Sequence, residues 1–365
     1  MIRVDSTRIA YDCRARQIRN RTAPCASLDW ARPCLAAFSL REQTHRQPSP
    51  GLIGATLESP PPAFVQISML AQPSLPKSRV RVMAVQYRMQ ACSGFEALAD
   101  RLRYFVGVAG DYACDFVCFP EFMALELLSL TPRRLDAKEA MRTMATHAGA
   151  IDRLFSELAQ RHRVNIIGGA FPRGLSDGSV RNLAGIYHRD GRIEHRSKLH
   201  VTPSEREIWA VSGGDDANVI ATDCGPIGIA ICYDAEFPEL VRHLTDQGAL
   251  LLFVPFCTDE RQGYLRVRYS CQARCIENQI YAVLAGTVGH LPRVLNMDIQ
   301  YAQSCILTPC DLMFARDGIA AEAAPDSEVV VFADLDLAAL LDARERGTVR
   351  NLADRRLDLY KLWQP

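Results

Sequence analysis

The chain has 365 residues, of which 48% are hydrophobic, and its 42 basic side chains balance its 42 acidic ones. This length can bury one large core or two smaller ones, and the balanced charge provides no basic field to attract nucleic acid or an anionic membrane. No apolar run is long enough to span a bilayer, and the 13 scattered cysteines lack paired zinc-knuckle spacing, which indicates reduced thiols in the cytoplasm.

The first 77 residues differ in composition from the rest. They are rich in Arg and Pro, contain no Lys before Lys77, and show no sustained helical or strand period. The run Pro60-Pro61-Pro62 would interrupt any long element. We therefore expect a disordered or extraneous leader over residues 1–77, with Met69 as a possible natural start, followed by a folded domain over residues 78–365. A transit peptide is a second interpretation, because the segment is Arg-rich and poor in acids.

Short apolar runs then alternate with amphipathic segments. Residues 80–87 have the pattern of a strand, and Ser93 and Glu96 have the spacing of a capping box in front of a helix. The further predicted elements are strand 116–119, helix 136–160, strand 164–171, a hairpin of 183–188 and 193–199, strands 219–222 and 227–231, helix 236–247, strand 249–255, helix 264–279, strands 280–285, 303–308 and 329–332, and a helix from Asp336. Alternating strands and helices predict the α/β class, and the hairpin, whose Asp190-Gly191 is a strong turn signal, favours mixed sheets over purely parallel ones.

One of these apolar runs ends at a cysteine. Residues 227–231 have the pattern of a buried strand, Cys232 follows directly, and a helix is predicted shortly afterwards. Backbone N–H groups and the dipole of that helix would favour a thiolate, so a nucleophile is a natural interpretation of Cys232. On this segment alone, a buried small hydrophobic residue is the better interpretation, because most free cysteines are of that kind.

Two other strand ends carry charged residues. Glu121 follows the run 116–119 and a proline, so partial desolvation would raise its pKa toward the range of a general base. Lys198 lies in the second arm of the hairpin, and an ammonium near a thiol would lower the thiol pKa and stabilise an oxyanion. With Cys232, these residues indicate acyl transfer through a thioester. Each also has a structural interpretation, as a helix-start charge for Glu121 and a solvated strand residue for Lys198.

Three segments together resemble the signature blocks of the nitrilase, or carbon–nitrogen hydrolase, superfamily. They are Phe119-Pro120-Glu121, Arg196-Ser197-Lys198-Leu199-His200 and Gly228-Ile229-Ala230-Ile231-Cys232-Tyr233-Asp234. Residues 274–279 are similar to the family's R-x-I-E-N helix, and residues 354–360 are similar to its closing segment. The resemblance covers roughly residues 79–361. Three ordered blocks with compatible spacing are far more specific than any one of them.

The resemblance implies a role for each matching residue. Cys232 would be the nucleophile, Glu121 the general base, and Lys198 the group that stabilises the tetrahedral intermediate. Glu205 matches the supporting glutamate of the family, although it lies in a connection that varies between members, and it also fits a first-turn acid. The backbone N–H of Tyr233 would complete the oxyanion hole. The implied fold is an α-β-β-α sandwich of two mixed sheets flanked by helices, pairing into an αββα-αββα dimer, with no metal or organic cofactor.

The implied activity is that of a cytoplasmic amidase that cleaves the C–N bond of a small linear amide and releases ammonia or an amine. Nitrilase and N-carbamoyl amide hydrolase are alternatives, and a non-catalytic binding or scaffold protein is an alternative of a different class. The expected partners are the small-molecule substrate and further copies of the chain, as a homodimer or larger oligomer, without nucleic acid or membrane. Phe256, Thr258 and Asp259 follow another predicted strand end and are expected to line the substrate pocket.

The histidines support weaker interpretations. His188, His195 and His200 lie close together in the sequence, but they lack cysteine or acid partners at ligand spacing, so no metal site is expected. A cysteine protease would pair Cys232 with a histidine such as His243. That arrangement would leave the lysine of the second signature block without a role.

Overall fold

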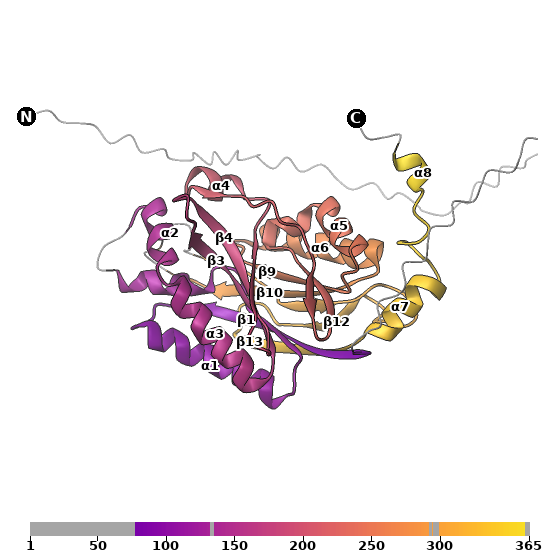
Figure 1. Cartoon of the computed structure of the whole chain (residues 1–365), viewed down its shortest axis with the longest axis horizontal. Helices are drawn as coiled ribbons and strands as arrows, with labels where there is room; N and C mark the ends of the chain where they lie inside the picture. Colours follow the sequence, from indigo (N-terminus) through magenta and orange to yellow (C-terminus); the bar gives the residue numbers. More distant parts are fainter. Residues whose placement is uncertain (1–76, 132–134, 292–293, 295–298, 362–365) are drawn as a thin grey trace, which may run out of the picture. The chain divides into compact units, whose positions relative to one another are not determined.

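A computed structural model describes residues 77–131, 135–291, 294 and 299–361. Apart from Lys77, the predicted leader lies outside these residues. In the described part of the chain, helices and strands alternate around a largely parallel central sheet (Figure 1), which confirms the mixed α/β class. No helix within these ranges is long and apolar enough to cross a membrane.

The chain builds this domain from short strands and amphipathic helices. In order, they are β1 (Arg79–Met89), α1 (Phe95–Asp111), β2 (Phe116–Cys118), the 3-10 helix η1 (Met123–Leu130), α2 (Ala137–Ala145), α3 (Ala148–His162), β3 (Asn165–Gly174), β4 (Val180–Tyr187), β5 (Ile193–Ser197), α4 (Pro203–Glu207), β6 (Val211–Ser212), β7 (Ile220–Thr222), β8 (Gly225–Ile229), the 3-10 helix η2 (Cys232–Glu236), α5 (Pro238–Asp246), β9 (Leu251–Phe256), α6 (Arg261–Asn278), β10 (Tyr281–Gly289), β11 (Cys305–Leu307), β12 (Ile319–Glu322), β13 (Val329–Asp336), α7 (Leu337–Arg346) and α8 (Leu357–Tyr360).

Strand β1 links the two halves of the sheet, whose order is β5-β4-β3-β2-β1-β10-β9-β8-β7. Its first part pairs in parallel with β2 and antiparallel with β13, whereas Tyr87–Met89 pair in parallel with Thr287–Gly289 of β10. The described strands therefore form one curled sheet, so the two predicted sheets are linked. Both halves of the sheet contribute to one hydrophobic cluster. In it, the ring centroids of Phe116 in β2 and Phe253 in β9 lie 5.1 Å apart.

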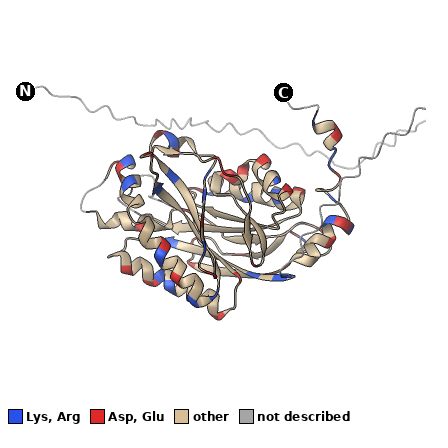
Figure 2. Ribbon diagram, viewed as in Figure 1, with Lys and Arg blue, Asp and Glu red and all other residues tan. Residues whose placement is uncertain are grey.

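Alternate residues of β1 face different hydrophobic clusters, as the two-residue period of a strand requires. Val82 and Ala84 belong to the cluster that includes side chains of α5 and α6. Met83 and Val85 belong to the cluster formed with α1 and α3. Figure 1 shows α1 beside α3, and α5 beside α6 across the strands from that pair. In Figure 2, acidic and basic residues are interspersed along the helices, whereas the central strands are largely uncharged.

Local predictions met different outcomes. The hairpin around Asp190-Gly191 is present, with Gly191 at φ +94°. The capping box at Ser93 is wrong, because Gly94 is the N-cap of α1 and no side chain caps that helix. The predicted helical region over 136–160 is present, but as two helices. The chain forms α2 and α3, and between them the Thr146 hydroxyl donates to the Thr143 carbonyl at 2.7 Å, a local bond that competes with helix continuation.

Candidate active site

Glu121, Lys198, Glu205 and Cys232 line one cavity of about 830 Å³. They come from separate parts of the chain: the connection after β2, the residue after β5, the helix α4, and the first position of η2. None of the four is more than 7% exposed. The structure therefore brings together all four side chains that the sequence singled out for chemistry.

The backbone around Glu121 is fixed by a bulge in the neighbouring strand. Phe122 adopts a left-handed φ of +63°, and its N–H donates to the Ala170 carbonyl at 2.7 Å. Gly169 lies in the bulge of β3 at φ +72°, and a Cβ there would lie 2.1 Å from the Pro120 carbonyl oxygen. Only glycine permits this approach, so the consecutive glycines 168 and 169 of β3 leave space for the turn that carries Glu121.

The carboxylate of Glu121 accepts hydrogen bonds from three directions. Its Oε1 atom accepts from Lys198 Nζ at 2.9 Å and from Asn182 Nδ2 at 2.7 Å. Its Oε2 atom accepts from the backbone N–H of Cys257 at 3.1 Å. The thiol of Cys232 donates to the Cys257 carbonyl at 3.6 Å and lies near enough to this carboxylate to influence its pKa. Glu121 is therefore held in one orientation beside the sulfur.

Burial raises the pKa of Glu121 to about 7. The ammonium of Lys198 opposes this rise, whereas the charge of Glu205 adds to it. A carboxylate with a pKa near neutrality can both accept and return a proton at physiological pH, which is what general acid–base chemistry requires.

Lys198 lies between two carboxylates. Its Nζ donates to Glu121 and to Glu205, each at 2.9 Å. Burial by itself would lower the pKa of Lys198, but the two carboxylates outweigh burial and raise that pKa well above its ordinary value, so the group stays charged. Glu205 also accepts from the Thr202 N–H at 2.8 Å in a capping box, which fixes it in the first turn of α4.

Cys232 lies on a sharp turn between β8 and η2, at a left-handed φ of +51°. The Asp234 carboxylate holds this turn by accepting from Ile231 N–H at 3.2 Å. It also accepts from the N–H groups of Leu199 at 3.2 Å and His200 at 2.8 Å, the two residues after Lys198. One carboxylate thereby ties the nucleophile turn to the segment that carries the lysine. A non-glycine residue in this backbone region is strained, and such strain concentrates at functional sites.

The surroundings of Cys232 oppose the thiolate that the sequence pattern favours. Burial raises the pKa of this thiol well above its ordinary value, and the charge of Glu121 raises it further, against the opposing effect of Lys198. The segment that follows is a five-residue 3-10 turn, and α5 begins only at Pro238, so no long helix starts at the sulfur. This direction disfavours the thiolate, so a base is needed to remove the thiol proton.

The other predicted site residues have mixed outcomes. Tyr233 and Thr258 line the cavity, as does Asp259. The N–H of Tyr233 lies in the first turn of η2, where N–H groups lack partners within the helix. Phe256 does not line the cavity: it is fully buried, and its ring packs on Tyr264 with centroids 6.1 Å apart. The substrate-binding prediction for Phe256 is therefore wrong.

Residues 81–345 match the model of the family described as "Carbon-nitrogen hydrolase". The chain belongs to this family. It is 49% identical over 284 residues to the Bacillus subtilis (strain 168) protein named "Probable hydrolase YhcX", covering 78% of this chain and 55% of that relative. It thus spans about half the length of that relative. It is 29% identical to the deaminated glutathione amidase of Dictyostelium discoideum, covering 68% of this chain and 84% of the relative.

Solved structures of the nitrilase superfamily share the fold of this carbon–nitrogen hydrolase. Saccharomyces cerevisiae Nit3, of branch 10 of that superfamily, matches with a TM-score of 0.61 and 21% identity, over 74% of this chain and 94% of the other. The carbon-nitrogen hydrolase from Helicobacter pylori G27 matches with a TM-score of 0.66 and 19% identity, over 79% and 99%. The predicted superfamily is confirmed.

The rest of the hydrolase cavity was not predicted from the sequence. Its apolar wall includes Phe122 and Trp209, whose rings meet edge to face at 5.1 Å. Near its rim, Arg266 Nε lies 3.6 Å from Glu236 Oε1. The remaining lining residues are Pro203, Ser204, Cys257, Glu260, Gly263, Val267, Ile299 and Gln300, with Thr202 of the capping box. No local motif marks these positions, because they meet only through the tertiary fold.

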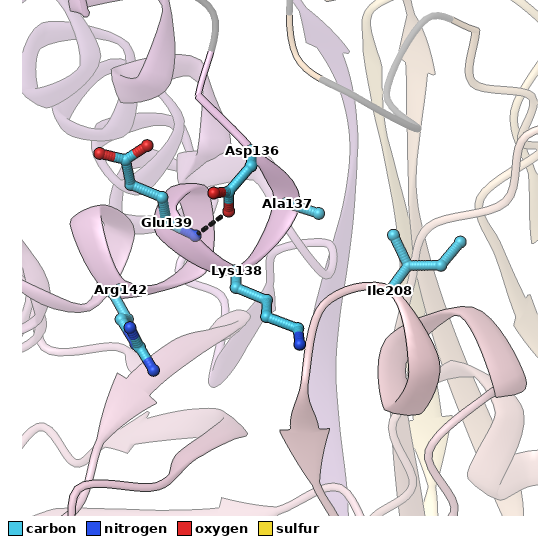
Figure 3. A pocket seen from close by; sticks show the side chains of 6 residues that line it. All are labelled: Asp136, Ala137, Lys138, Glu139, Arg142 and Ile208. Atoms are coloured by element: carbon cyan, nitrogen blue, oxygen red, sulfur yellow. Dashed lines mark hydrogen bonds between the residues drawn. The ribbon is translucent and has the colours of Figure 1, made fainter. Parts of the chain in front are cut away.

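A second hollow, of about 560 Å³, lies between the start of α2 and Ile208 (Figure 3). Its lining includes Lys138, Arg142 and Asp136, and Asp136 caps α2 by accepting from Glu139 N–H at 2.8 Å. None of the described residues that line it is a cysteine or a histidine.

The histidines of the hairpin do not meet. His188 contacts Glu194, His195 contacts Asp152, and His200 contacts Asp234. Across the described ranges, no group of three or more His, Cys, Asp or Glu side chains could hold a metal ion.

Proposed function

We propose that this chain is an amidase that cleaves the C–N bond of a small linear amide through a thioester on Cys232. The observation that carries the proposal is the convergence of Cys232, Glu121 and Lys198 on one cavity, where Lys198 donates to the Glu121 carboxylate at 2.9 Å. The adjoining cavity of about 830 Å³ falls within the usual size of small-molecule sites.

In the first half of the proposed reaction, Glu121 takes the thiol proton as Sγ of Cys232 forms a bond to the amide carbon. The oxyanion that results is stabilised by the Lys198 ammonium and the Tyr233 N–H. When the tetrahedral intermediate collapses, the C–N bond breaks, and Glu121 gives its proton to the departing nitrogen. Ammonia or an amine leaves, and the acyl group stays on sulfur as a thioester.

In the second half, a water molecule enters the space that the amine has left. Glu121 takes one of its protons, and the water oxygen attacks the thioester carbon. The C–S bond then breaks, the acid product leaves, and the sulfur regains a proton from Glu121. Glu205 supports both halves by holding Lys198 on the side away from the reacting carbon.

The names of relatives favour amides as substrates. The Dictyostelium discoideum relative is named an amidase, and a Xenopus tropicalis relative with 28% identity is named an omega-amidase. In a Glu-to-Gln mutant of the amidase from Nesterenkonia sp. AN1, which shares the fold at a TM-score of 0.61, the acetamide moiety of fluoroacetamide is added covalently at the active-site cysteine. By the same resemblance, we propose a two-layer αββα protomer that pairs into a homodimer in the cytoplasm, acting on a small molecule without nucleic acid, membrane or cofactor.

An ammonia-release screen tests the activity, with panels of small linear amides, ω-amides, N-carbamoyl amines and nitriles. We expect release from at least one amide, and a loss of about 10⁴-fold or more in Cys232→Ala, because that change removes the proposed nucleophile. Cys224→Ala is the matched control. It removes another buried cysteine, one that does not line the cavity, and should keep the wild-type rate within a few-fold.

The outcomes separate the alternatives. Release from nitriles or N-carbamoyl amines alone would replace the amidase by one of those two hydrolases. A wild type that releases nothing above the Cys232→Ala blank across all panels would favour a non-catalytic member of the fold.

A further inference from the structure

Asn182 is a buried amide in contact with the proposed machinery but outside the cavity. It lies in β4, is fully buried, and does not line the cavity. Its backbone carbonyl accepts from Lys198 N–H at 2.8 Å, which places its side chain beside that lysine. Asn182 therefore contacts the site on its buried side, away from the cavity, and cannot touch a substrate.

The side chain of Asn182 duplicates the bridge made by Lys198. Its Nδ2 atom donates to Glu121 Oε1 at 2.7 Å and to Glu205 Oε1 at 3.3 Å. Lys198 Nζ donates to the same two oxygens, each at 2.9 Å. Two carboxylate oxygens are thus joined twice, once by a cation and once by a neutral amide.

The orientation of this amide follows from its partners. Turning it over would place Oδ1 against two carboxylate oxygens, where acceptors repel, so the amide nitrogen must face them. In this orientation Oδ1 is buried without a hydrogen-bond partner in the described structure. An unsatisfied buried acceptor lowers the stability of the fold, so this orientation serves the two carboxylates at a cost in stability.

We propose that Asn182 is a positioning residue that keeps Glu121 and Glu205 together, with Glu121 aimed at the thiol, while Lys198 turns its charge toward the oxyanion. The inference rests on the proposed function for its meaning, but its geometry is independent of any substrate. A neutral donor suits this task. Unlike the Lys198 ammonium, it is not attracted to the negative charge that develops on the substrate, so it stays hydrogen-bonded to the carboxylates.

The titration of Glu121 reports on this role. The charged and titratable groups that face it are Lys198, Glu205, Cys232 and Cys257, each from a different part of the chain. A donor to the carboxylate favours the ionised form, so removing the Asn182 donor should leave Glu121 protonated over a wider pH range.

Asn182→Leu, of similar size, tests the proposal. A hydrogen bond to a charged group contributes roughly 1.5–3 kcal/mol, so kcat should fall roughly 10- to 100-fold, with KM nearly unchanged. The acid limb of kcat/KM should move up by about one pH unit. In Asn182→Asp, the new carboxyl can donate only when protonated. Its rate relative to wild type should therefore rise on the order of tenfold between pH 8 and pH 6.

A second measurement needs no substrate. Iodoacetamide alkylation of Cys232, followed by mass spectrometry of its peptide against pH, gives the midpoint at which the Glu121–Cys232 pair loses its first proton. This midpoint should move up by about one unit in Asn182→Leu. Asn165→Leu is the matched control. It removes another buried asparagine that donates to an acid, Asp223, away from the cavity. In Asn165→Leu, the midpoint for alkylation of Cys232 should stay at its wild-type pH.

The outcomes are distinct. Unchanged kcat and an unchanged alkylation midpoint in Asn182→Leu would overturn the inference, as would an equal shift in Asn165→Leu. If Asn182→Leu does not fold, as judged by thermal unfolding, the pH-dependent recovery of Asn182→Asp decides the matter, and no recovery overturns the inference. A wild type without turnover, but with a midpoint that responds to Asn182, would refute the proposed activity and leave the positioning role intact.

Discussion

Glu121 and Glu126 are two glutamates on one segment, each no more than 1% exposed, and burial raises the pKa of both. Glu126 lies in η1, and hydrogen-bond donors satisfy both of its carboxylate oxygens. Both of its oxygens accept from Arg101, at 2.7 and 2.9 Å, and the Tyr87 hydroxyl and the Gln90 N–H donate to it at 2.9 and 2.7 Å. An arginine nitrogen shared by both oxygens, with additional donors, is an arrangement that satisfies a buried carboxylate in a structural role.

Glu121 has a different environment. It shares one ammonium with Glu205, so two buried carboxylates have a single cation between them. It also faces a cavity of about 830 Å³ and a thiol. The difference teaches that burial alone does not mark a functional acid. A carboxylate with too little positive charge around it retains a proton near neutral pH, and only that carboxylate can exchange protons with a bound molecule.

The largest expected effect comes from replacing each glutamate with glutamine. Glu121→Gln removes the proposed base, and kcat should fall about 10³- to 10⁴-fold while the protein stays at least as stable as wild type. Glu126→Gln should lower kcat only a few-fold, but it removes the buried one of the two carboxylates paired with Arg101, leaving Glu328, and should reduce the free energy of unfolding by about 3 kcal/mol. Ammonia release and denaturant unfolding, measured on both variants, check that one variant loses turnover and the other loses stability.

The opposite pattern would remove the distinction between the two acids. If Glu126→Gln loses as much turnover as Glu121→Gln while remaining folded, the η1 network takes part in the reaction. If Glu121→Gln unfolds more easily than Glu126→Gln, the Glu121 cluster serves mainly stability.

The four residues of the site could be predicted because each is a charged or nucleophilic side chain within a recognisable segment. Asn182 had no such signal: a neutral amide in a strand acquires meaning only through the register of β4 on β5, which places it beside Lys198. The ionisation state of Cys232 could not be predicted either. It depends on how many carboxylates surround the sulfur in three dimensions, and those come from distant segments.

The class of the fold and most strands followed from apolar periodicity, but the path of the sheet did not. Its curl depends on the last residues of β1 pairing with β10, a contact between segments about 200 residues apart in the sequence. Phe256 shows the same limit at a single position. Strand β9 continues through it, and its ring covers Gly286 of β10, where a Cβ would lie 2.3 Å from the ring. The cavity wall therefore begins one residue later.

A smaller effect concerns stability against pH. The folded pKa of Glu121 is about 7 against an ordinary 4.5, so between these values the folded state binds more protons than the unfolded state. Stability should therefore fall as pH rises through this window, by about 3 kcal/mol from Glu121 alone. The pKa of Glu126 is also raised, so the effect of Glu121 is isolated by subtracting the unfolding free energy of Glu121→Gln from that of wild type, at pH 5 and pH 8. An equal difference at both pH values would contradict the unusual proton affinity of Glu121.

The smallest effect tests how the segment carrying both glutamates is positioned. Gly169 and Gly178 have similar left-handed φ values, +72° and +81°, but a Cβ would lie 2.1 Å from the Pro120 oxygen at Gly169 and within 4 Å of nothing at Gly178. Gly178→Ala should therefore show backbone strain alone, about 1 kcal/mol, with unchanged kcat. Gly169→Ala should lose about 2 kcal/mol and also turnover, because Pro120 directly precedes Glu121. Arg101 and Tyr87 bond Glu126, five residues beyond Glu121, so the fluorescence of Tyr87 should stay native-like. Equal losses in the two variants would mean that the bulge of β3 supports the fold without aiming Glu121.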